Sequence, residues 1–186
     1  MSPDISRDEF QPPIEIDSVE ATGGIIRNMD LWLDPHGVAH VLYLKTNLSG
    51  MLRDRFFPGQ KIATSLEHAE IDRGKVIRRT TLLTGGEGAA ETPQYGRFHA
   101  TEDGTLYLVF TVGGRKPDGS RLLENRIIRV LPRDEGESPV RLDLDEPFTK
   151  LFTANERGGS PASDVLDLFG SGRNSNTLRY ARIRLR

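Results

Sequence analysis

A short motif recurs three times along the chain. The segment 97–110 (RFHATEDGTLYLVF) reads as two strands around the turn 102–104, and 30–43 (DLWLDPHGVAHVLY) matches it sixty-seven residues earlier. A shorter copy, LFTAN at 151–155, matches RFHAT at 97–101. Repeats at a spacing of this size predict an array of similar structural units.

A second signature follows the first in each unit. It reads LEHAEI at 66–71, LENRII at 123–128 and LRYARI at 178–183. Apolar and polar residues alternate around these segments, glycine and proline separate them, and no segment keeps a 3.6-residue apolar period. The sequence therefore predicts an all-β protein of low helix content, built from four-stranded antiparallel meanders.

We expect about three such units, at about 25–84, 95–145 and 149–186, within a segment spanning 14–186. Units of this kind are typical of the blades of a β-propeller. The alternatives are a β-sandwich and a parallel β-helix, but the first would not repeat strand signatures in order and the second has a shorter period. Residues 1–13 are polar and predict a disordered lead-in.

Three blades are fewer than the roughly four to eight that close a ring. The chain is therefore expected either to be part of a longer protein with further blades or to form a homodimer with six blades. Residues 14–19 alternate apolar and polar side chains and predict a strand that pairs at a distance. That strand would supply the outer strand that the third blade lacks.

Composition excludes several classes of function. A net charge of -2 argues against nucleic acid or an anionic membrane as the main partner. The absence of cysteine excludes disulfides, and four scattered histidines predict no metal site. No apolar run follows a basic segment, so we expect a soluble chain without a signal peptide of its own, whose localisation, including export within a longer protein, stays open.

Long loops are expected at 46–61, 84–95 and 113–120, at one end of the predicted blades, and candidate ligand residues gather there. Arg97 and His99 are two residues apart on a strand and point to one side, and their counterparts are Asp30 and Trp32. A guanidinium binds a carboxylate, and a histidine can move a proton. The full set of predicted substrate-binding residues is Arg97, Arg53, Arg55, Asp30, Trp32, Glu124, Asn125 and Arg126.

A catalytic set is predicted beside Arg97. Glu87 and Tyr95 precede it on the loop between two blades, and His99 follows it, so proton abstraction beside a carboxylate or acid–base hydrolysis would be within reach. The alternative is structural: Trp32 would belong to the core and His99 would be a satisfied histidine. In the loop after Arg55, the two phenylalanines would be anchors rather than ligand contacts.

The segments FTANERGGSPASDVLDLFG at 152–170 and NTLRYARIRL at 176–185 resemble the final blades of sialidase-like propellers with BNR repeats, especially uncharacterised bacterial members. The resemblance implies carbohydrate as the substrate class and, for an enzyme, a glycoside hydrolase or a polysaccharide lyase. It implies no sialidase activity, because 101–105 (TEDGT) only approximates the Asp-box and no arginine triad matches.

The resulting interpretation is a carbohydrate-active or carbohydrate-binding propeller segment that recognises an acidic saccharide without a cofactor. The alternative is a non-catalytic scaffold that presents its loops to a protein partner. The two differ in one respect: an enzyme needs Glu87, Tyr95, Arg97 and His99 to converge, whereas a scaffold pairs them elsewhere.

Overall fold

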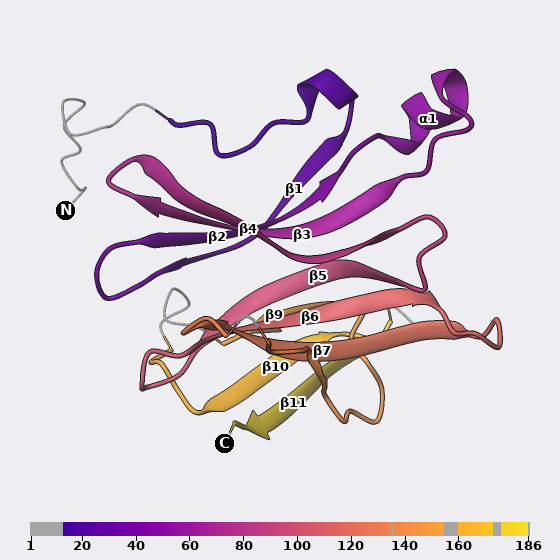
Figure 1. Cartoon of the computed structure of the whole chain (residues 1–186). Helices are drawn as coiled ribbons and strands as arrows, with labels where there is room; N and C mark the ends of the chain where they lie inside the picture. The colour runs from indigo at the N-terminus through magenta and orange to yellow at the C-terminus, as the bar shows by residue number, and fades with distance from the viewer. Residues whose placement is uncertain (1–12, 135, 155–159, 173–175, 186) are drawn as a thin grey trace.

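A computed structural model describes residues 13–134, 136–154, 160–172 and 176–185. The chain forms three antiparallel sheets in succession (Figure 1). The first contains β1 (Ile25–Leu33), β2 (Ala39–Thr46), β3 (Ala63–Asp72) and β4 (Lys75–Gly86), the second β5 (Glu91–Ala100), β6 (Leu106–Arg115), β7 (Arg121–Leu131) and β8 (Val140–Arg141), and the third β9 (Lys150–Thr153), β10 (Val165–Ser171) and β11 (Leu178–Arg184). The helical elements are α1 (Gly50–Phe56) and the 3-10 helix η2 (Glu20–Thr22).

This architecture confirms the all-β class and its low helix content. Each sheet is a meander whose strands pair in chain order, and the first strands β1, β5 and β9 contact one another in turn. In each sheet, we call the face that looks in the direction from the first sheet toward the third its front, and the opposite face its back. The front of the first sheet packs on the back of the second, and the front of the second packs on the back of the third.

Two apolar cores fill these junctions. Leu42 and Leu66 meet Phe98 and Phe110 between the first and second sheets. Between the second and third sheets, Val109 and Ile127 meet Leu151, Leu166 and Leu168. Because the second sheet is covered on both faces, successive residues of β6 are buried in opposite cores, which explains why its sequence is a continuous apolar run.

The repeated hairpin turns have the same local chemistry. Gly37 and Gly104 adopt left-handed backbone with φ of 84° and 83°, which only glycine tolerates without strain. Asp34 Oδ1 accepts from the amides of His36 and Val38 at 2.8 Å, and Asp103 Oδ1 accepts from the amide of Thr105 at 2.9 Å. The first and second hairpins predicted from the repeat therefore form as expected.

The match between the third copy of the motif (151–155) and the second copy (97–101) is one residue out of register with the structure. The match paired Phe98 with Phe152, but Phe98 is buried on the back of the second sheet, whereas Phe152 lies on the front of the third and is 44% exposed. Thr153 faces back instead, and its hydroxyl donates to the carbonyl of Phe98 at 2.7 Å. Side chains alternate between faces along a strand, so a shift of one residue exchanges the faces.

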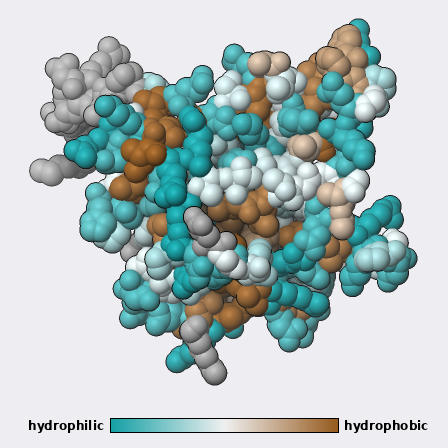
Figure 2. All heavy atoms as spheres, in the orientation of Figure 1, coloured by the Kyte–Doolittle hydropathy of each residue, from teal (hydrophilic) through white to brown (hydrophobic). Residues whose placement is uncertain are grey.

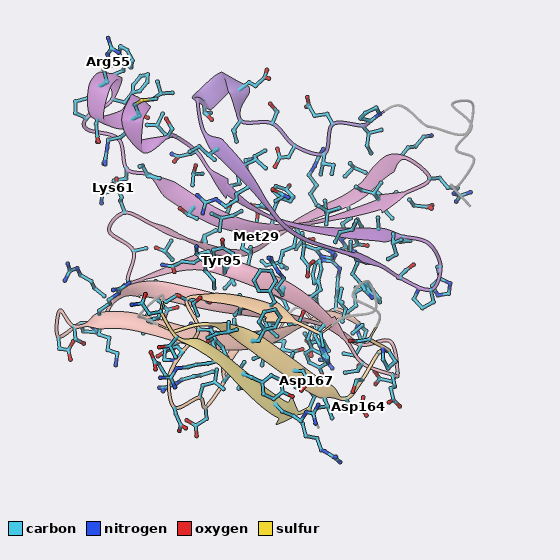
Figure 3. All side chains as sticks on the ribbon, turned by 180° about the vertical axis from the view of Figure 1, so that it is seen from behind. Met29, Arg55, Lys61, Tyr95, Asp164 and Asp167 are labelled. Atoms are coloured by element: carbon cyan, nitrogen blue, oxygen red, sulfur yellow. The ribbon has the colours of Figure 1, made fainter. Side chains whose placement is uncertain are left out.

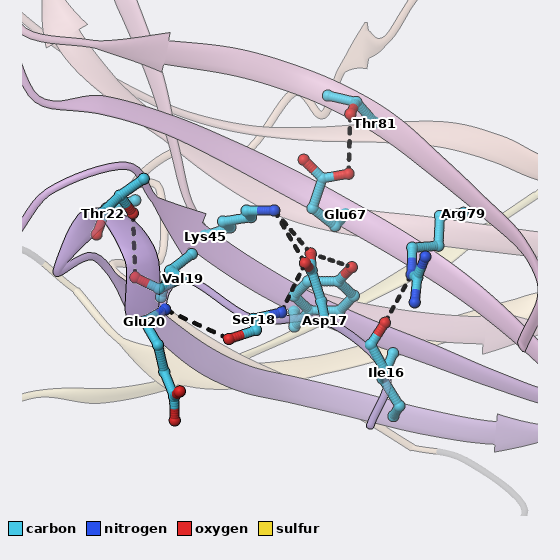
Figure 4. Close-up of polar contacts among 12 residues, drawn as sticks. Ile16, Asp17, Ser18, Val19, Glu20, Thr22, Lys45, Glu67, Arg79 and Thr81 are labelled. Atoms are coloured by element: carbon cyan, nitrogen blue, oxygen red, sulfur yellow. Dashed lines mark hydrogen bonds and ion pairs between the residues drawn. The ribbon is translucent and has the colours of Figure 1, made fainter. Parts of the chain in front are cut away.

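The segment 13–19 forms no strand, and it does not complete the third sheet. It crosses the back of the first sheet, at the other end of the array, and we call it the strap (Figure 4). Asp17 accepts from Tyr43 Oη and from Lys45 Nζ at 2.9 Å, and Arg79 donates to the carbonyl of Ile16 at 2.6 Å. The predicted disordered lead-in, residues 1–13, lies outside the described residues except for its last position.

Three other boundaries differ from the prediction. The loop expected at 84–95 is mostly strand, because β4 runs to Gly86 and β5 begins at Glu91. The loop expected at 46–61 contains α1, whose first turn is capped by Ser49 Oγ accepting from the amide of Leu52 at 3.3 Å. The second unit, expected to extend to about 145, ends in a strand of two residues, β8.

A pair of buried histidines lies in the first junction. His40 Nδ1 and His68 Nε2 are 2.9 Å apart, and the two side chains are 2% and 0% exposed. The rings of Trp32 and Phe98 pack on either side of the pair. Burial lowers the pKa of His68 to about 3, and burial also lowers the pKa of His40. Both side chains are therefore neutral in the fold at pH 7.

We expect acid to destabilise this junction. Between pH 6.5 and about 3, the unfolded chain takes up a proton at position 68 that the folded chain excludes, so stability falls as the pH falls through that window. From pH 7.5 to pH 5.0 the unfolding equilibrium constant should rise about 30-fold through His68 alone. Urea unfolding should show this rise, and His68→Gln should remove it.

The exposed His36 provides a matched control for this experiment. His36→Gln removes a histidine without altering the buried pair, so the pH dependence of unfolding should stay that of the original chain. Equal pH dependence of unfolding in His68→Gln and the original chain would contradict the prediction.

Candidate functional site

Arg97 lies where the first strands of the three sheets meet. It projects from β5, and its Nη1 donates to the carbonyl of Met29 on β1 and, at 2.9 Å, to that of Gly96. Its Cζ lies 4.9 Å from the centre of the Phe152 ring on β9 and 6.0 Å from that of Tyr95. Met29 and Tyr95, both labelled in Figure 3, contact the apolar core between the first and second sheets.

One edge of this guanidinium is available to a ligand. Both hydrogen bonds use Nη1, and within the described parts of the chain Nε and Nη2 donate to no acceptor and no carboxylate pairs with Arg97. The two remaining nitrogens form the fork that binds a carboxylate through two parallel hydrogen bonds. The neighbouring rings hold the cation through cation–π contact. The arrangement suits an anionic or polyhydroxylated ligand.

Aromatic surface continues outward from Arg97. The rings of Phe152 and Phe169 stack with their centres 5.2 Å apart at 19°, and each is 44% exposed. Sequence reasoning missed both residues as site candidates, because β9 and β10 carry apolar residues on both faces and so predict complete burial. The pairing of β9 with β10 could have indicated them, because Phe152 and Phe169 are direct cross-strand partners and so lie side by side on one face.

Asp30 and Trp32 serve the junction between the first two sheets. Asp30 is 7% exposed, and its carboxylate accepts from the amide of Phe98 at 2.9 Å and from that of Leu31 at 3.0 Å. Trp32 packs against the first core and its ring lies 5.2 Å from that of His40. Trp32 is therefore a core residue, as the structural alternative expected. Asp30 holds β5, the strand that carries Arg97, through the amide of Phe98.

The four residues of the predicted catalytic cluster, Glu87, Tyr95, Arg97 and His99, do not converge on one site. His99 is 3% exposed, burial lowers its pKa, and its Nε2 contacts the carbonyl of Ser163 at 2.8 Å. Glu87 accepts from Arg53 at 2.7 Å and from the amide of Ile62 at 3.0 Å. Only Tyr95 remains beside Arg97. The reason is that β5 begins early and places Tyr95 on a strand, while the third sheet covers His99.

The predicted basic and aromatic loop is a separate surface on α1. Arg53 pairs with Asp54 and Glu87, and Arg55 lies 5.1 Å from the ring of Phe56. Phe56 and Phe57 are 57% and 44% exposed and so do not anchor the loop. Figure 2 shows hydrophobic atoms at the surface over α1, at the upper right.

The three predicted ligand residues of β7 have protein partners. Arg126 binds Glu91 through two hydrogen bonds of 2.7 and 2.6 Å and contacts Glu124 at 2.9 Å. Asn125 is 1% exposed; its Nδ2 donates to Thr111 and to the carbonyl of Phe148 at 3.0 Å, and its Oδ1 accepts from the amide of Phe148 at 2.7 Å. Asn125 therefore holds the chain between the second and third sheets.

We expect Asn125→Ala to lower stability and to leave ligand contact unchanged. The substitution leaves the amide of the buried Phe148 without its acceptor and the carbonyl of Phe148 with only the Thr111 hydroxyl, at a cost of about 1–3 kcal/mol in the free energy of unfolding. Arg55→Ala, at an exposed position, should stay within about 0.5 kcal/mol. Urea unfolding measures both, and unchanged stability in Asn125→Ala would show that its hydrogen bonds are not structural.

Within the described residues, no helix has the length and apolar character to cross a membrane, and no group of three or more acidic or histidine side chains is arranged to hold a metal ion. No family model matches the sequence, and no curated protein matches it. Among solved structures, the fold is similar to an endo-arabinase from Bacteroides thetaiotaomicron VPI-5482, with a TM-score of 0.51 and 13% identity. The likeness covers 94% of this chain and 61% of that one, so the chain spans less than two thirds of its length.

Proposed function

We propose that the three sheets are consecutive blades of a β-propeller and that the chain binds an acidic saccharide at Arg97. Two findings support the propeller: antiparallel meanders of four, four and three strands follow one another with their first strands in contact, and the fold is similar to an endo-arabinase, a carbohydrate-active enzyme. In this arrangement β1, β5 and β9 line the central axis, and Arg97 stands beside it.

The observation that carries the saccharide proposal is the donor edge of Arg97 between aromatic rings. A uronate presents a carboxylate that two guanidinium nitrogens bind together, and hydrogen bonds of this charged kind contribute about 1.5–3 kcal/mol each. The C–H face of the same sugar packs on an aromatic ring such as Tyr95, whose centre lies 6.0 Å from the Arg97 Cζ. Charge and ring face thus select an acidic sugar over a simple anion.

The proposal is recognition rather than a defined reaction. Of the predicted acid–base residues, His99 is buried against Ser163 and Glu87 is paired with Arg53, which leaves Tyr95 as the titratable side chain beside the guanidinium. If the chain acts as an enzyme, Tyr95 is the proton-transfer residue that this geometry supports.

A second function, a protein-interaction scaffold, is supported by α1. Met51 is 78% exposed and lies on the same short helix as Phe56 and Arg55, so one protruding element presents apolar, aromatic and cationic groups together. Protein interfaces are enriched in these residue types.

We expect Arg97→Gln to reduce affinity for uronate-containing oligosaccharides about tenfold or more, because one charged hydrogen bond alone corresponds to that factor. A glycan array followed by calorimetry on the best ligand measures the change. Arg55→Gln is the matched control, since it removes an exposed arginine on α1 and should leave affinity unchanged.

Two results would overturn the saccharide proposal. One is a folded original chain that binds no glycan on the array. The other is equal loss of affinity in Arg97→Gln and Arg55→Gln, which would assign binding to overall charge instead of the Arg97 fork. Thermal unfolding of each variant separates lost binding from lost folding, because Arg97 also holds the carbonyl of Met29.

A further inference from the structure

The two ends of the sheet array carry most of the exposed large apolar side chains. Among the described residues fourteen such side chains are exposed, and eight of them lie on the back of the first sheet with its strap or on the front of the third sheet. The first group is Ile14, Ile26, Leu31 and Leu33; the second is Phe152, Phe169, Leu178 and Tyr180. Exposed apolar side chains gathered on one face are typical of an interaction site.

The front of the third sheet carries an aromatic row, defined here as Phe152, Phe169 and Tyr180. The three residues are direct cross-strand partners on β9, β10 and β11 and therefore lie side by side. Tyr180 also donates to Asp167, which is paired with Arg182 at 2.7 Å.

The sequence repeat relates the aromatic row to positions that another sheet covers in the first two sheets. Tyr180 in LRYARI occupies the position of His68 in LEHAEI and of Asn125 in LENRII. His68 and Asn125 are 0% and 1% exposed, because the following sheet covers each of them, whereas Tyr180 is 61% exposed. The aromatic row is thus the face on which a further sheet packs.

The back of the first sheet has the complementary character. A hollow of about 590 Å³ opens between the strap and α1, with Ile26, Val19 and Met51 in its lining and Glu15 and Glu20 among its acidic residues. The front of the third sheet is flanked by the exposed cations Lys150 and Arg184. One end therefore presents the exposed acids Glu15 and Glu20 beside apolar side chains, and the other presents the exposed cations Lys150 and Arg184 beside the aromatic row.

We propose that the aromatic row of one copy docks on the back of the first sheet, beside the strap, of a second copy. Each copy carries one face of each kind, so two such contacts related by a twofold axis close the pair into a ring of six sheets. Lys150 and Arg184 then face Glu15 and Glu20 across each contact, which favours this partner over like-charged ones. The inference extends the propeller arrangement and does not depend on saccharide binding.

Light scattering on the full chain over a range of concentrations tests the association. The expected mass is twice the 20.7 kDa of one chain. Phe169→Ser should weaken dimerisation about tenfold or more, because it removes an aromatic side chain from the centre of the contact. Phe57→Ser is the matched control, since Phe57, which directly follows α1, is also 44% exposed and its substitution should leave the dimer intact.

A charge-reversal pair identifies the two faces. The double variant with Lys150→Glu and Arg184→Glu places like charges across both contacts of its dimer, and so does the double variant with Glu15→Lys and Glu20→Lys. When the two variants are mixed, opposite charges meet at both contacts, so the mixed dimer should form with the affinity of the original chain while each variant alone stays monomeric.

A mass of 20.7 kDa at every concentration would overturn the proposal, and so would equal effects of Phe169→Ser and Phe57→Ser. Assemblies that grow without limit would contradict the closed ring, because front-to-back contacts that fail to close make filaments. Arg97→Gln should leave the mass unchanged, which keeps failure of this inference distinct from failure of saccharide binding.

Discussion

The peptide groups of Phe98 connect all three sheets. Asp30 on β1 accepts a hydrogen bond from the Phe98 amide at 2.9 Å, and Thr153 on β9 donates one to its carbonyl at 2.7 Å. One residue of β5 is thereby held from both neighbouring sheets while its ring lies in the first core. A carboxylate bond to a buried amide is strong because both groups are removed from water. The position of Arg97, the residue directly before Phe98, follows from this double attachment.

Local chemistry explains which parts of the fold could be predicted. The hairpin turns at Gly37 and Gly104 depend on left-handed glycines and aspartate-capped amides, and these are visible in a few adjacent residues. The start of β5 was missed because Pro93 argues against a strand, yet the structure accommodates it beside a register shift in the pairing of β5 with β6. The strap was read as a strand because its alternation fits one, but Asp17 holds it by side-chain bonds.

In the candidate site, too, the local sequence predicted the strand positions of residues but not their long-range contacts. Alternation on a strand placed Arg97 and His99 on one face, but it could not show that the third sheet would bury His99 and leave Arg97 at the margin. Pairings such as Glu87 with Arg53, thirty-four residues apart, depend on how α1 packs. Long-range burial and pairing therefore decided the roles of residues whose types alone suggested catalysis. Tyr95 and Arg97 remain in the candidate site because they lie next to each other where the first strands of the sheets meet.

The shortness of β8 has a consequence for solubility in concentrated solution. β8 covers β7 only at Arg126 and Ile127, so much of the outer edge of an eleven-residue strand has no strand partner among the described residues. Such an edge can pair with an edge of another molecule and start aggregation. Arg126 and Arg129 stand on this strand with acidic partners at Glu91 and Glu137, and desolvating these ion pairs would oppose edge-to-edge stacking. The charged pairs on β7 therefore stand where they disfavour pairing of this edge with another molecule, in addition to linking parts of the fold.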